Sequence, residues 1–64
     1  MVTIIYMPLL NEGTSVWRPV EAEPLGRRLY RVIAEAPDDE EWEFPTGTVV
    51  VVDDGNRIVS SMEP

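Results

Sequence analysis

The sequence predicts an all-β fold of five short strands in a single domain spanning residues 1–64. Six prolines and four glycines divide the chain, so its apolar segments are short. These segments are rich in Val, Ile, Tyr and Trp, the side chains that suit a pleated sheet. Residues typical of turns recur at the close spacing expected of a small barrel or sandwich.

The first two strands are expected at 2–9 and 16–23. Both faces of the first strand are largely apolar, which predicts a strand that is central or covered on both sides. Pro8 has no N–H, so it should end the ladder of this strand or place its end at a sheet edge. In the second strand we expect a bulge or bend at Arg18-Pro19, where the ladder is interrupted.

The other three strands are expected at 28–34, 48–53 and 57–62. Pro24 to Arg27 predicts a tight turn before the third strand, in which Gly26 is free to take a positive φ. Asp54-Gly55 predicts a hairpin with a type I′ turn between the fourth and fifth strands. An SH3-like small barrel, closed or half-open, would remove the sheet edges that so short a chain cannot otherwise protect. A sandwich-like half barrel completed by dimerisation is the alternative.

The composition excludes most catalytic chemistry. The chain has no Cys and no His, which excludes disulfides, thiolate chemistry, His-based acid–base catalysis and the usual zinc sites. It also has no Lys and no glycine-rich phosphate loop, so Ser60 and Ser61 have no evident base to activate them. We therefore expect no catalytic residues, no cofactor and no metal.

The formal charge of −7 restricts the classes of partner. It argues against direct nucleic-acid binding and against anionic membranes, both of which attract Lys and Arg. It is compatible with a protein partner, and a basic one in particular. No apolar run approaches the roughly 18 residues of a membrane helix, and the first residues lack a signal peptide's basic region. We expect a soluble, cytoplasmic protein.

An acidic segment between Glu35 and Glu43 holds six of the twelve carboxylates. Pro37 followed by four acidic residues is compatible with one helical turn. Trp42 and Phe44 follow, and we expect this aromatic end to fold back over the barrel mouth. The segment is either a solvated loop or a contact surface for a basic partner.

A second candidate site is Trp17-Arg18, beside Pro19. An exposed aromatic side chain next to a cationic one is typical of binding hot spots. In the alternative interpretation, Trp17 belongs to the core and Arg18 pairs with an acid of the acidic segment. The candidate partner-binding residues are Trp17, Arg18, Asp38, Asp39, Glu40, Glu41 and Trp42.

Two stretches carry a resemblance to known sequences, VWRPVEA at residues 16–22 and PDDEEWEFPTGTVV at residues 37–50. They resemble short uncharacterised bacterial proteins that share both stretches, and the local pattern is similar to SH3-like barrels. The resemblance implies a bacterial source and a small standalone protein. It brings no assigned activity, so no site residue is carried over.

These observations together predict a non-enzymatic protein-binding or regulatory module. One alternative is an acidic inhibitor or immunity-type protein that mimics nucleic acid and blocks an enzyme that binds it. The other is a structural subunit or homodimer.

Overall fold

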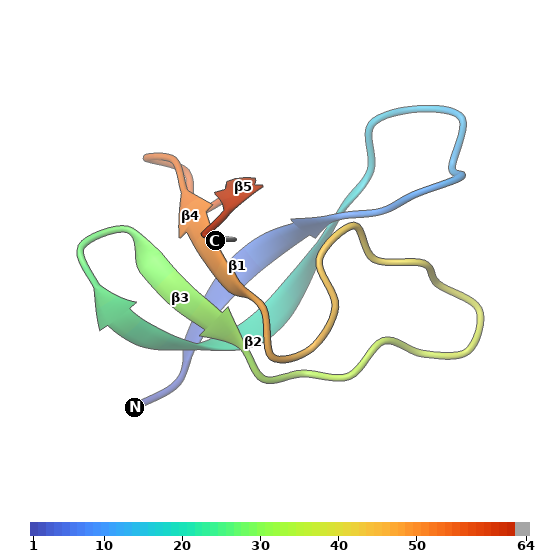
Figure 1. The fold of residues 1–64 in the computed structure, drawn as a ribbon. Helices are drawn as coiled ribbons and strands as arrows, with labels where there is room; N and C mark the ends of the chain where they lie inside the picture. Colours follow the sequence, from blue (N-terminus) through green and yellow to red (C-terminus); the bar gives the residue numbers. More distant parts are fainter. Residues whose placement is uncertain (63–64) are drawn as a thin grey trace.

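Five antiparallel strands form one sheet in the computed structural model, which describes residues 1–62 (Figure 1). The strands are β1 (Thr3–Pro8), β2 (Trp17–Gly26), β3 (Leu29–Val32), β4 (Val49–Val52) and β5 (Ile58–Ser61). They lie in the sheet in chain order, β1-β2-β3-β4-β5. The prediction of an all-β, five-stranded fold is confirmed, and the result is a curled half-barrel consistent with an SH3-like barrel.

The sheet curls until β5 meets β1. Tyr6 pairs in parallel with Arg57, and the Tyr6 N–H donates to the Asn56 carbonyl at 2.8 Å. In a parallel ladder a strand donates at every second residue, so the next donor on β1 would be residue 8. Pro8 has no N–H, so the closing pairs do not continue past it.

The core lies on the concave side of the curled sheet. Its buried side chains are Ile5, Met7, Val20, Ala22, Val32, Trp42, Val50, Val52 and Ile58. On β1, Ile5 and Met7 are fully buried, whereas Ile4 and Tyr6 are 46% and 38% exposed. The prediction that β1 is central or covered on both faces is therefore wrong, because β1 is the first strand in the order of the sheet and a single curled layer covers only its concave face.

The predicted bulge at Arg18-Pro19 is also wrong. The register of β1 and β2 runs without a shift from Thr3↔Ala22 to Pro8↔Trp17. The Leu9 N–H donates to the Val16 carbonyl at 3.0 Å, so the alternation of the ladder points the nitrogen of Pro19 away from β1. No residue of β3 lies opposite Pro19, and its missing donor therefore breaks no pair.

The first hairpin turn lies two residues later than predicted. β2 continues to Gly26 and shifts its register between Pro24 and Gly26. Arg28, with φ of 62°, takes the left-handed conformation that was expected of Gly26.

The second hairpin turn lies where Asp54-Gly55 predicts it, but its type differs. Asn56, with φ of 61°, is the left-handed residue, and its N–H donates to the Asp53 carbonyl at 3.0 Å. This arrangement is a type I turn followed by a left-handed residue, not type I′. The Asp53 carboxylate accepts the N–H groups of Gly55 and Arg57, both at 2.9 Å, which fixes the turn.

The acidic segment contains one turn and no helix. The Glu40 N–H donates to the Pro37 carbonyl at 3.1 Å, closing a single turn over Asp38 and Asp39. No helix that could span a membrane occurs in the described part of the chain.

Candidate partner-binding site

The two long loops of the fold are joined at the end of β1. The Leu10 N–H donates to the Glu41 carbonyl at 2.8 Å, and the Glu43 N–H donates to the Pro8 carbonyl at 3.1 Å. Between these bonds, Leu9 forms a bridge with Trp42. The loops at 9–16 and 33–48 therefore leave the barrel at the same end (Figure 1).

Glu40 anchors the acidic segment to β2. Arg18 donates through Nε to Glu40 Oε2 at 2.6 Å, and Trp42 donates through Nε1 to Glu40 Oε1 at 3.0 Å. Both carboxylate oxygens are thus engaged, and the Glu40 side chain is only 9% exposed. The predicted pairing of Arg18 with an acid of this segment is confirmed.

The same contacts shift the ionisation of both partners. The hydrogen bond from Arg18, followed by that from Trp42, lowers the pKa of Glu40 below its ordinary value. The hydrogen bond to Glu40 raises the pKa of Arg18. Arg18 and Glu40 are therefore a charged pair at neutral pH, and the pair holds the acidic segment in place.

Trp42 is part of the core, with 9% of its surface exposed. Its ring lies in the cluster against which Leu9 and Phe44 pack. The aromatic end of the acidic segment thus folds inward, as the sequence predicts, but it leaves no Trp42 ring for a partner to contact. Of the candidate residues, the exposed ones are Trp17, Arg18, Asp38, Asp39 and Glu41.

Trp17 lies at the surface, contrary to the interpretation that places it in the core. Its side chain belongs to the first residue of β2, opposite Pro8, and is 37% exposed. The Arg57 guanidinium lies over the ring, 5.9 Å from its centroid, in a cation–π contact. Arg57 Nε is also 3.4 Å from the Asp53 carboxylate, so this cation already has two neighbours.

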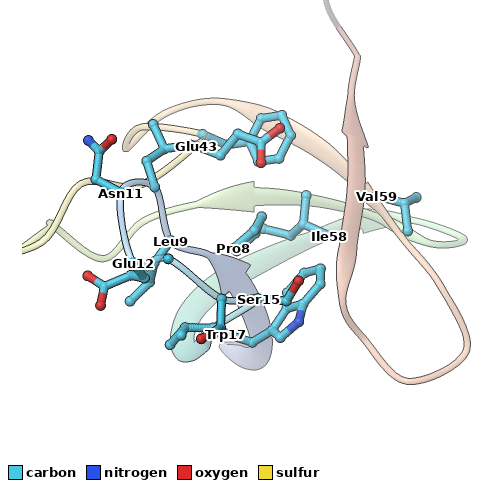
Figure 2. Close-up of a pocket in the computed structure, with 14 residues that line it drawn as sticks. Pro8, Leu9, Asn11, Glu12, Ser15, Trp17, Glu43, Ile58 and Val59 are labelled. Atoms are coloured by element: carbon cyan, nitrogen blue, oxygen red, sulfur yellow. The ribbon is translucent and has the colours of Figure 1, made fainter.

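A groove of about 620 Å³ lies beside Trp17; we call it the Trp17 groove (Figure 2). Trp17 and Glu43 lie on opposite sides of it, with Ile58 between them. It is lined by residues 8–17 together with Glu43, Phe44, Ile58 and Val59. Most of these residues were not candidates from the sequence, because three segments distant along the chain form the groove.

A second hollow of about 470 Å³ adjoins the Trp17 groove and shares Leu9, Glu12, Val16 and Trp17 with it. Its charged lining residues are Glu12, Arg18, Asp39 and Glu40. The Trp17 groove itself has only Glu12 and Glu43 as charged lining residues. Trp17 therefore lines two hollows, and in each of them carboxylates outnumber cationic groups.

The residues around these hollows offer an exposed aromatic ring and carboxylates for contact with a partner. Across residues 1–62, no three acidic side chains converge into a possible metal site. The Asp53 carboxylate is occupied by the backbone N–H groups of its own turn. Comparisons of the chain with protein-family models, curated proteins and solved structures find no match.

Proposed function

We propose that this protein is a non-enzymatic protein-binding or regulatory module, which contacts its partner through the Trp17 groove and the neighbouring acidic segment. The observation that carries the proposal is the exposure of Trp17, which lines two hollows. A domain of this size needs its large side chains for a small core, and Trp42 serves that purpose. An exposed Trp in a groove is typical of an interface anchor.

The charge around Trp17 supports a basic partner. Glu12 and Glu43 line the groove, and Asp38, Asp39 and Glu41 are exposed on the adjoining segment. The net charge of −7 has the same sign. Complementary charge accelerates association and discriminates against wrong partners, even where it adds little affinity.

Glu40 and Trp42 contribute to this proposal as supports. They fasten the acidic segment to β2 and to the core, so its exposed carboxylates are held in a fixed position. A preorganised surface loses less conformational entropy on binding than a mobile one.

A capture experiment from lysate of the source cells tests the proposal. The test variants are Trp17→Ala and the triple charge reversal Asp38→Lys, Asp39→Lys and Glu41→Lys, which leaves Glu40 intact. The matched control reverses Glu21, Glu23 and Asp54 to Lys, exposed residues outside the acidic segment, which makes the same change in net charge. Circular dichroism establishes that every variant is folded.

We expect the wild type and the control to retain the same proteins and both test variants to lose them. Binding that falls steeply with added salt would agree with the role of charge. If both test variants keep every partner, or if the wild type retains none, the proposed surface is wrong.

A further inference from the structure

The outer edge of β5 has backbone groups that point away from the sheet. β5 pairs with β4 along one edge, and within residues 1–62 its other edge meets β1 only at the Tyr6–Arg57 bridge. The Met62 N–H donates to the Val49 carbonyl at 2.8 Å. The alternation of the ladder then turns the N–H and C=O of Ser61 outward.

Two features keep this edge open: the missing donor of Pro8, and the segment at 41–43, which already pairs with β1 through the Pro8 carbonyl and the Leu10 N–H. The rung after the Tyr6–Arg57 bridge would need an N–H from residue 8 to meet the Ile58 carbonyl, and proline has none. The Trp17 groove lies at this point, since Pro8, Ile58 and Val59 all line it. Figure 2 shows Val59 on the strand that borders the groove, with Ile58 inside it.

The walls of the groove suit an extended chain. Ile58 and Val59, the first two residues of β5, line one side, while Glu43 and Phe44 belong to the segment that already pairs with β1 through Pro8. Trp17 and Phe44 provide apolar surface, and the volume of about 620 Å³ lies within the usual range of binding pockets.

We propose that the Trp17 groove accepts an extended basic peptide segment of a partner protein, which pairs with the outer edge of β5 as an additional strand. This inference rests on the proposed protein-binding function and specifies its mode. In strand addition, main-chain hydrogen bonds provide affinity and alternate side chains provide specificity.

The charges favour a basic segment over a second copy of this chain. Every charged residue that lines the groove is acidic, namely Glu12 and Glu43. A second copy would bring the same charge of −7 to this edge, and like charges oppose self-association. The edge itself, Ile58–Ser61, has neither a charged residue nor a proline, the devices by which many edge strands avoid pairing.

Synthetic peptides test the mode of binding. The probe is a capped peptide of about eight residues that alternates arginine and valine. Two matched peptides carry N-methyl groups on every second amide. One is methylated on the arginine amides and the other on the valine amides, so that both have the same loss of flexibility. Calorimetry measures affinity, and amide hydrogen exchange by NMR measures protection of Ser61.

We expect the unmodified peptide to bind and to protect the Ser61 amide. One methylated peptide should bind at least about tenfold more weakly than the other, because only one set of amides faces β5. Pro8→Val restores a donor that can occupy the Ile58 carbonyl, so this carbonyl is no longer free for the peptide and binding should weaken by a similar factor. A glutamate–valine peptide should not bind.

Four outcomes would overturn the strand-addition proposal. They are no binding of the arginine–valine peptide, equal binding of the two methylated peptides, an unprotected Ser61 amide in the complex, and a dimer by light scattering that protects this amide without peptide. Partners that are still captured in a Trp17-dependent way would then leave the protein-binding function standing. Loss of that capture would reject the function itself.

Discussion

Ile4 and Ile5 are adjacent, chemically identical and on opposite faces of β1, so they provide a direct test of the one-layer fold. Ile5 is 0% exposed and Ile4 is 46% exposed. The perturbation is the removal of one methylene group from each side chain in turn, as Ile5→Val and Ile4→Val.

The expected magnitudes differ clearly. Ile→Val in a core destabilises by about 0.5–1.5 kcal/mol, whereas a surface substitution usually stays within about 0.5 kcal/mol. For 64 residues, the total unfolding free energy is about 3–10 kcal/mol. A loss of about 1 kcal/mol lowers the Tm of so small a domain by about 4–8 °C. We therefore expect a resolved loss for Ile5→Val and almost none for Ile4→Val.

Urea unfolding followed by tryptophan fluorescence measures the difference, because the buried Trp42 reports on the core. The slope of unfolding free energy against urea should not change, so that the midpoints compare stability directly. Substitution by lysine gives a larger difference. The Ile4→Lys protein should fold, whereas the Ile5→Lys protein should not, because it would bury an unpaired charge. Equal losses for the two valine variants, together with an unfolded Ile4→Lys, would refute the assignment of one buried face.

Three further predictions concern the anchor, the second hairpin and the open edge. The lowered pKa of Glu40 means that its contribution to stability is present above pH 4.5, its ordinary value, and is lost as pH falls through the lowered one. The urea midpoint of the wild type should therefore fall with pH in this range, and that of Glu40→Gln should fall less. An equal fall in both would contradict the role of Glu40 in anchoring the acidic segment. Asn56→Ala should lower the unfolding free energy by about 1 kcal/mol through its left-handed backbone. Gly55→Ala should leave the unfolding free energy nearly unchanged by the same assay, whereas in a type I′ turn, where Gly55 would need a positive φ, it would be destabilising. Pro8→Val should raise the unfolding free energy by about 0.5–1.5 kcal/mol through one added hydrogen bond, and no gain in the urea midpoint would count against an added rung.

Local signals were enough to predict the five strands, because alternation and turn residues act over a few positions. They could not determine which face of β1 is buried, since both faces are apolar and only the number of layers decides. The Pro19 prediction failed for a related reason. A proline disturbs a ladder only where its nitrogen faces a neighbour, and that depends on register and on where β3 ends.

The candidate site was predictable in its charges and not in its shape. The concentration of Arg and of carboxylates in separate segments indicated the pairing that Arg18 and Glu40 form. Nothing local distinguishes Trp17 from Trp42, although one is exposed and the other is buried. Their environments follow from the Leu9–Trp42 bridge, a contact between residues distant in sequence.

The four ion pairs of the described residues leave the molecule with little free positive charge. Arg18, Arg28, Arg31 and Arg57 each lie against a carboxylate of the same chain, and the chain has only five basic residues. A phosphate or an acidic protein that approaches the surface therefore meets mostly cationic groups that are already paired, on a chain whose net charge of −7 repels it. If the Trp17 groove is the interface, its negative charge would favour cationic partners, and the occupied Arg side chains would offer little to anionic ones.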